Sequence, residues 1–313
     1  MGEGSGLSMT YPGILVQTLV FPGLAFTAAV GLFLSWVDRK VTARVQMRQG
    51  PPLLQPFYDV AKYFVKETCI PAGATLWVFL AAPLVGLAGA TVASTMIGGS
   101  LLDPSRGYVG DLIVVIYLLV LPSLAVIMGA FSSGNPLASV GGSREMKLLL
   151  SYELPFILAL VVPILNAGSI RLGDIAATVS IARPSGVLAL LVALICMQGK
   201  LGLVPFDLPE AETELTGGAL IEYSGAPMGI FRLTRNMLLY VLPLFLVTAF
   251  CGPVAPGGMG VLRGVICFVV LVVLITLIRN TAPRFRTDHA VRFFWGPVSV
   301  TALAAVALHA LGW

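Results

Sequence analysis

The sequence has little charge. Only 11% of its 313 residues are Asp, Glu, Lys or Arg, and 57% are apolar, whereas an ordinary soluble domain has about 25% charged residues. This balance excludes a water-soluble enzyme and a disordered chain, because so apolar a chain buries itself in the nearest apolar phase. The roughly ten-residue alternating pattern of membrane barrel strands is also missing. We therefore predict an all-α, polytopic membrane protein.

Residues that commonly bind metals are scarce and badly spaced. The chain has two histidines and four cysteines, and the cysteines are Cys69, Cys196, Cys251 and Cys267. None forms a CxxC pair or another zinc or iron-sulfur spacing, so we predict no metal ion or cofactor in this chain. The 19 Lys and Arg residues are spread over short loops, and nucleic-acid binding is therefore not expected.

Eight apolar runs are long enough to cross about 30 Å of hydrocarbon as helices. We place them near residues 12–37, 73–98, 111–132, 148–168, 184–205, 229–251, 261–279 and 291–311. No internal repeat or soluble segment separates them, so residues 1–313 are predicted to form a single membrane domain. Most Lys and Arg residues follow the odd-numbered runs, which predicts that those loops are cytoplasmic and that both termini are on the other side.

A shorter amphipathic helix is predicted after the first run. Its apolar face holds Phe57, Val60, Ala61 and Phe64, and its charged face holds Asp59, Lys62 and Lys66. This pattern is typical of a helix that lies along the cytoplasmic membrane surface. It fits an anchor for lipid headgroups and a docking surface for a soluble partner equally well.

Carboxylates gather after the fifth run. The five acids are Asp207, Glu210, Glu212, Glu214 and Glu222. Helix capping explains one such acid, but not five. Clustered carboxylates raise one another's pKa values and can hold or pass a proton near neutral pH. We therefore predict a proton-handling role.

Glu153 lies inside the fourth apolar run. A carboxylate in a membrane helix costs about 2.5–3.5 kcal/mol on insertion scales, so it should be paired, hydrated or protonated, and it marks a functional site by default. The alternative is an interfacial ion pair with Arg144 or Lys147.

Four segments together resemble a known family. They are DRK-x3-R-x-Q-x-R-x-GP from Asp38, SYE ending at Glu153, PFDLPEAE from Pro205 with EYSG from Glu222, and PRFR-x-D from Pro283. They are similar to the complex I membrane subunit that forms the floor of the quinone site, and to its homologues in energy-converting nickel-iron hydrogenases. The resemblance runs from about residue 12 to the C-terminus.

Three departures favour the hydrogenase branch. The segment GPPLLQPFYD, from Gly50, lacks the insertion usual in complex I. Arg235 stands where quinone-type members usually have Glu, and Leu148 where they have Gln. PRFR-x-D, by contrast, is more like complex I. The leading interpretation is a membrane-anchoring, ion-translocation-coupling subunit of an energy-converting hydrogenase, and the alternative is the quinone-site subunit of complex I.

The resemblance implies partners and site residues. The partners are hydrogenase small and large subunits, a ferredoxin-like iron-sulfur subunit and antiporter-like membrane subunits, in a prokaryotic cytoplasmic membrane. The nickel-iron site and iron-sulfur clusters would lie in these partners. The implied proton or Na⁺ pathway comprises Glu153, Asp207, Glu210, Glu212, Glu214 and Glu222, and the implied soluble-arm junction comprises Asp38, Arg39, Arg44, Arg48, Asp59, Arg284, Arg286 and Asp288. A passive scaffold and a stand-alone transporter are the remaining alternatives.

Overall fold

The computed structural model describes residues 11–104, 107, 109–210, 216–252 and 258–312. Its ordered elements in these ranges are all helical, as predicted, and no strand occurs there. The elements are α1 (Tyr11–Leu19), α2 (Leu24–Val45), α3 (Gln55–Val65), α4 (Leu76–Leu102), α5 (Asp111–Ser132), α6 (Pro136–Ala167), α7 (Leu172–Ala177), η2 (Ser180–Ala182), α8 (Pro184–Lys200), η3 (Gly218–Leu220), α10 (Gly225–Phe250), α11 (Gly258–Thr281), α12 (Thr287–Phe293), the π-helical turn η4 (Phe294–Val298) and α13 (Ser299–Ala310).

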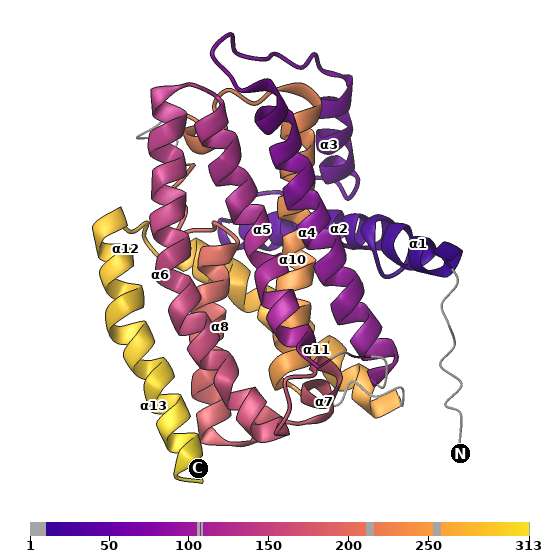
Figure 1. Cartoon of the computed structure of the whole chain (residues 1–313), viewed down its shortest axis with the longest axis vertical. Coiled ribbons are helices and arrows are strands. Elements are labelled where there is room, and N and C mark those ends of the chain that lie inside the picture. Colours follow the sequence, from indigo (N-terminus) through magenta and orange to yellow (C-terminus); the bar gives the residue numbers. More distant parts are fainter. Residues whose placement is uncertain (1–10, 105–106, 108, 211–215, 253–257, 313) are drawn as a thin grey trace.

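The membrane helices confirm a multi-pass membrane protein. Seven helical segments of the described residues are long and apolar enough to cross a bilayer, and the eighth predicted run is α8, an apolar helix of 17 residues. All eight predicted runs thus coincide with helices. α4, α5, α6 and α10 run alongside one another, with α8 and α13 beside α6, and α2 crosses them (Figure 1).

The first run is broken in the middle. Phe21, Pro22 and Gly23 separate α1 from α2. The carbonyl oxygen of Pro22 accepts hydrogen bonds from the hydroxyls of Thr27, at 3.1 Å, and Ser94, at 3.0 Å. These side chains satisfy a backbone group that the helix break leaves without its usual partner.

α6 is longer than predicted. It begins at Pro136 rather than at residue 148. The side chain of Asn135 caps it by accepting the Leu137 N–H at 2.8 Å, and Pro136 suits the first helical turn. The added turns carry Glu145 into the bundle, where it is buried.

α3 is found where the amphipathic pattern predicts it, packed on α2 and α10. Its buried face differs from the predicted one, however. Pro56 and Val60 are buried, whereas Phe64 is 52% exposed. Asp59 instead points toward α2, where it pairs with Arg39, and this ion pair fixes the rotation of the helix.

The loop between α8 and η3 is held against α12. Phe206 is buried and packs on Phe285 and Phe294, with ring centroids 5.7 and 4.6 Å away. The Phe285 N–H donates to the carbonyl oxygen of Pro205 at 3.0 Å. These contacts place Asp207 and Glu210 beside the start of α12.

Candidate functional site: charged cavities around the loop after α8

Three cavities surround this loop. The inner cavity, of about 80 Å³, is lined by α5, α6, α8 and α10, and its polar side chains are Ser123, Glu145, Lys200, Asp207, Glu210, Arg232, Thr234 and Arg235. The wide cavity, of about 550 Å³, lies between α2, α3 and α10. The basic cavity, of about 590 Å³, lies between α6 and the segment that leads into α12.

Two predicted acids stand between the first two cavities. Asp207 and Glu210 line both the inner and the wide cavity, together with Arg232 and Arg235. Sequence reasoning expected these carboxylates to gather, and the structure brings these two together. Glu212 and Glu214 lie outside the described residues.

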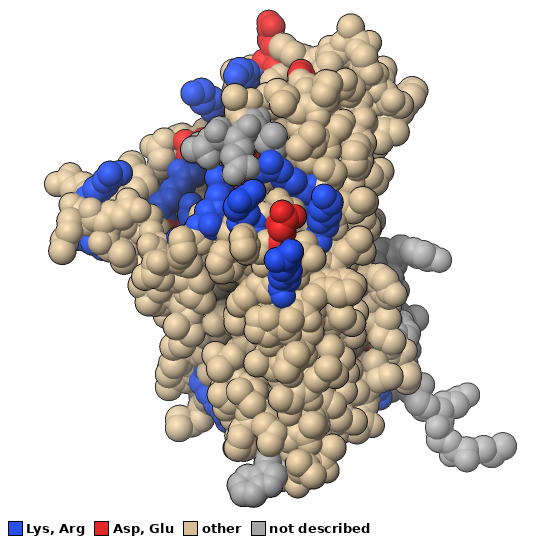
Figure 2. Space-filling model, turned by 90° about the vertical axis from the view of Figure 1, so that its left-hand side faces the viewer, with Lys and Arg blue, Asp and Glu red and all other residues tan. Residues whose placement is uncertain are grey.

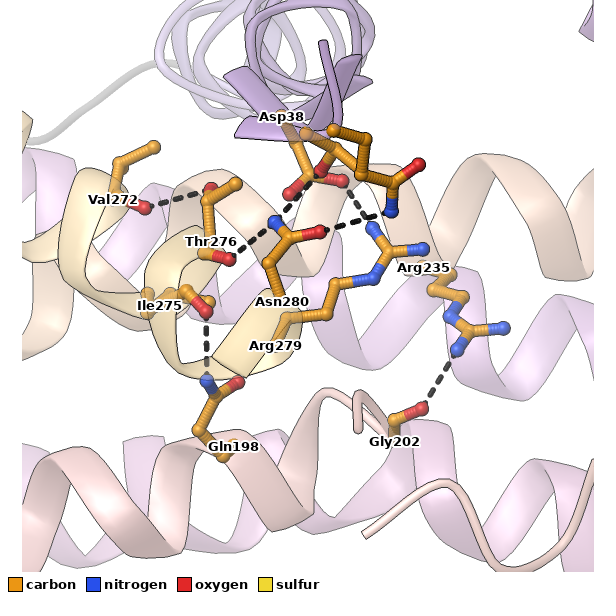
Figure 3. Close-up of polar contacts among 11 residues, drawn as sticks. Asp38, Gln198, Gly202, Arg235, Val272, Ile275, Thr276, Arg279 and Asn280 are labelled. Carbon is orange, nitrogen blue, oxygen red and sulfur yellow. Dashed lines mark hydrogen bonds and ion pairs between the residues drawn. The ribbon is translucent and has the colours of Figure 1, made fainter. Parts of the chain in front are cut away.

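Glu210 is held by arginines of α10. Arg235 donates to its carboxylate at 2.5 Å, and Arg232 lies 3.8 Å away. Burial opposes ionisation of Glu210, but the two guanidinium groups outweigh it and lower its pKa below the ordinary value. Arg235 also donates to the carbonyl oxygen of Gly202 at 2.8 Å (Figure 3), so it fixes the loop as well as the acid.

Asp207 has the opposite bias. Arg284 donates to its Oδ2 at 2.7 Å, while its Oδ1 is buried without a hydrogen-bond partner. Burial raises the pKa of Asp207 above its ordinary value, and the nearby Glu210 carboxylate adds to the shift, although Arg235 and Arg284 oppose it. Two neighbouring acids with shifts of opposite sign provide one site that stays ionised and one that takes up a proton more readily.

Glu153 forms an ion pair within the bundle. Its Oε2 accepts a hydrogen bond from the ammonium group of Lys200 at 2.7 Å. The Lys200 side chain is 1% exposed, and its ammonium group lies 4.7 Å from the ring centre of Phe156. The alternative pairing with Arg144 or Lys147 is therefore wrong, because the partner comes from α8.

The predicted junction residues are divided between ion pairs and the surface. Arg279 on α11 pairs with Asp38 on α2, beside Asn280 (Figure 3), and Arg39 pairs with Asp59 at 2.6 Å. All four line the wide cavity. Arg44 and Arg48 are exposed beyond it.

The last group of predicted residues lies apart from these acids. Arg284, Arg286 and Asp288 line the basic cavity. Glu222 accepts a hydrogen bond from Asn135 at 2.5 Å, and this contact supports the cap of α6 and places Glu222 outside the three cavities. On the face that carries α6 and α12, Lys and Arg gather in a band across the middle, and few charged groups lie below it (Figure 2).

The sequence analysis did not single out four charged residues of the site. They are Glu145, Lys200, Arg279 and, as an ion-pair partner, Arg235. Asn135 followed by Pro136 is a helix-start signal that could have placed Glu145 inside α6. Lys200 ends an apolar run and so looked like a loop cation. Only the tertiary structure shows that it points inward.

Comparison with known proteins identifies the family. The NADH dehydrogenase family model matches residues 17–310. A membrane subunit of the NADH-quinone oxidoreductase of Rhodospirillum rubrum is 34% identical, over 91% of this chain and 90% of that protein, and the corresponding protein of Thermomicrobium roseum is 32% identical over 97% of each. A chain of an archaeal respiratory membrane complex, the membrane-bound sulfane sulfur reductase, superposes with a TM-score of 0.82 at 26% identity, covering 95% of this chain and 99% of that one. The chain therefore belongs to the NADH dehydrogenase family and is a complex I-like membrane subunit of a multisubunit respiratory complex.

Proposed function

We propose that this chain couples electron transfer in an attached soluble arm to the movement of H⁺ or Na⁺ across a prokaryotic cytoplasmic membrane. One observation carries the proposal. Asp207 and Glu210 line both the wide cavity and the inner cavity, and the inner cavity is lined in turn by Glu145 and Lys200. Ionisable groups thus continue from the wide cavity to the buried Glu153–Lys200 pair.

The coupling is electrostatic. Arg235 lies at the centre of the group, because it pairs with Glu210 and its charge also acts on Asp207 and Glu145. A change of charge in the soluble arm alters the balance between these ion pairs, and Asp207, with its raised pKa, gains or loses a proton in response. The chain itself carries no electron.

The proposed arrangement in the membrane follows the distribution of charge. The wide cavity and its rim face the cytoplasm and the soluble arm, and both termini lie on the opposite side. Six of the proposed junction residues line the wide or basic cavity, namely Asp38, Arg39, Asp59, Arg284, Arg286 and Asp288. Antiporter-like membrane subunits would receive the ion movement.

Two electron acceptors fit this role, and the names of the relatives favour quinone. The two bacterial relatives described above belong to NADH-quinone oxidoreductases, and neither carries a hydrogenase name. As the quinone-site subunit, the chain would line the pocket that holds the quinone ring.

The chemistry of the wide cavity favours the hydrogenase branch. Ten charged side chains line it, namely Asp38, Arg39, Asp59, Lys62, Lys66, Asp207, Glu210, Arg232, Arg235 and Arg279. An isoprenoid tail requires an apolar lining. Arg235 occupies the position where the resemblance expects the Glu of quinone-type members, and it closes this wall with its ion pair to Glu210. In this branch the soluble arm would hold the nickel-iron site and the iron-sulfur clusters.

Ion transport in vesicles tests the coupling role. The purified complex is reconstituted with Glu153→Gln and, separately, Glu210→Gln. We expect redox turnover with artificial donors to continue while ion uptake falls at least tenfold. Asp174→Asn is the control, because this acid lies outside the three cavities and binds only Ser169 in the described contacts. Full ion uptake by both variants would refute the proposal.

The acceptor is decided by activity of the same complex. Reduction of a short-chain quinone that stops with inhibitors of the quinone pocket would establish the quinone branch. Hydrogen evolution or uptake that is insensitive to those inhibitors would establish the hydrogenase branch.

A further inference from the structure

The basic cavity holds an excess of positive charge that the coupling role does not use. It is lined by four cationic side chains, Arg144, Lys147, Arg284 and Arg286, and by one acid, Asp288. Its volume of about 590 Å³ is within the range of roughly 300–1,000 Å³ that is typical of ligand pockets. Like charges gathered around a hollow repel one another, so an anion inside it is favoured.

A second observation points to an anionic ligand. The Nε of Arg284 is buried and has no hydrogen-bond partner, although another nitrogen of the same guanidinium group donates to Asp207 at 2.7 Å. A buried donor without an acceptor is costly, and a ligand oxygen in the cavity would satisfy it.

The position of the cavity identifies the source of the anion. On α6, directly below Lys147, the side chains of Leu150, Leu154 and Ile157 are 60%, 46% and 44% exposed along one face. The first of these is one helical turn from Lys147, or about 4.5 Å along the axis at 1.5 Å per residue. A headgroup bound by the cations therefore has an apolar surface for its acyl chains immediately beneath it.

The opposite wall repeats this order. Arg286 and Asp288 lie at the start of α12 and are followed by Trp295, Val300 and Leu303, which are 61%, 63% and 54% exposed. An exposed Trp between charged and apolar zones is typical of the membrane interface. Both walls thus change from charged to apolar in the same direction.

We infer that the cavity between α6 and α12 binds the headgroup of an anionic phospholipid. The cations of both walls contact the phosphate, and the acyl chains lie on the exposed faces of α6 and α13. Because Arg284 contributes to the cavity and also pairs with Asp207, a bound phosphate lies one side chain away from the proposed proton site.

Lipid titration of the whole complex in detergent tests this inference. Lys147→Gln combined with Arg286→Gln removes one cation from each wall. The matched control is Arg183→Gln combined with Arg263→Gln, two exposed cations outside the three cavities. Native mass spectrometry measures binding of phosphatidylglycerol, with phosphatidylcholine and inorganic phosphate as the other probes. We expect about tenfold or greater weakening for phosphatidylglycerol in the cavity variant alone, and phosphatidylcholine binding unchanged.

Two further variants fix the sign of the effect. Asp288→Asn removes the acid of the cavity and should strengthen phosphatidylglycerol binding severalfold. Lys147→Arg with Arg286→Lys keeps the charge and should keep the affinity. Equal phosphatidylglycerol affinity in the wild type and the double Gln variant would overturn the inference, as would loss of affinity in the charge-conserving variant. Inorganic phosphate binding as tightly as the lipid would assign the cavity to a free anion. Loss of the soluble arm at unchanged lipid affinity would assign it to a protein contact.

Discussion

Lys200 and Glu153 join α8 to α6 by an ion pair inside the bundle, 2.7 Å between ammonium nitrogen and carboxylate oxygen. The two side chains are 1% and 18% exposed, and the other carboxylate oxygen of Glu153 is buried without a partner. The pair is therefore stable only while both charges are present, and the free oxygen lets Glu153 accept a further hydrogen bond or a proton.

Removing one member of this pair should destabilise the protein. Lys200→Met leaves the Glu153 carboxylate without its counter-charge, at a cost of about 3 kcal/mol. Lys200→Met combined with Glu153→Gln removes both charges and should recover most of that loss. Thermal unfolding in detergent measures the difference. The exposed Arg39–Asp59 pair is the control, because its loss should cost at most about 1 kcal/mol. A single variant as stable as the double one would contradict the buried pair.

Changing Arg284 should move the protonation of Asp207. The pKa of Asp207 is already raised, chiefly by burial, and Arg284 acts against this shift. Arg284→Gln therefore raises the pKa further, and Glu210→Gln lowers it by removing a nearby negative charge. Infrared titration of the protonated carboxyl band, identified by its loss in Asp207→Asn, measures the midpoint. Midpoints that shift together in one direction would contradict this account.

Stability at acid pH should depend on Glu210. Burial disfavours its charge, but Arg235 and Arg232 lower its pKa below that of an unfolded glutamate. Its contribution to stability is thus present above the ordinary pKa of 4.5 and is lost as the pH falls below that value. Arg235→Gln should flatten this loss. Denaturation midpoints between about pH 3 and pH 6 provide the measurement; an unchanged slope in Arg235→Gln would show that the pair does not stabilise the fold.

Close packing around α6 should make Gly141 intolerant of a side chain. A Cβ at Gly141 would lie 2.5 Å from the backbone nitrogen of Ala219 in η3, whereas a Cβ at Gly99 in α4 would meet nothing within 4 Å. Gly141→Ala should therefore lower the thermal unfolding midpoint by several degrees. Gly99→Ala should be neutral or stabilise by up to about 1 kcal/mol, because alanine favours a helix. Equal effects of the two substitutions would contradict the packing of η3 against α6.

The sequence pattern located the membrane helices well because hydrocarbon thickness imposes a simple length and polarity rule. It failed where local signals compete. The charges of Arg144 and Lys147 suggested a loop, yet the cap formed by Asn135 extends α6 past both residues. The face of α3 was predicted from apolar spacing, but an ion pair between Asp59 and Arg39 determines it.

Residues that pair across the bundle were the hardest to predict. PFDLPEAE marked Asp207 and Glu210 by their clustering, and the structure brings both to shared cavity walls. Their counter-charges, Arg284 and Arg235, come from distant segments. No spacing rule connects such positions, because their proximity arises from tertiary packing alone.

Redox-induced infrared difference spectroscopy of the intact complex tests the coupling most directly. When the soluble arm is reduced, we predict a change in the protonated carboxyl band that disappears in Asp207→Asn and shifts in Arg284→Gln, while Asp174→Asn leaves it unchanged. A spectrum with no carboxyl protonation change on reduction, in wild type and variants alike, would contradict the account and leave the chain as a membrane anchor.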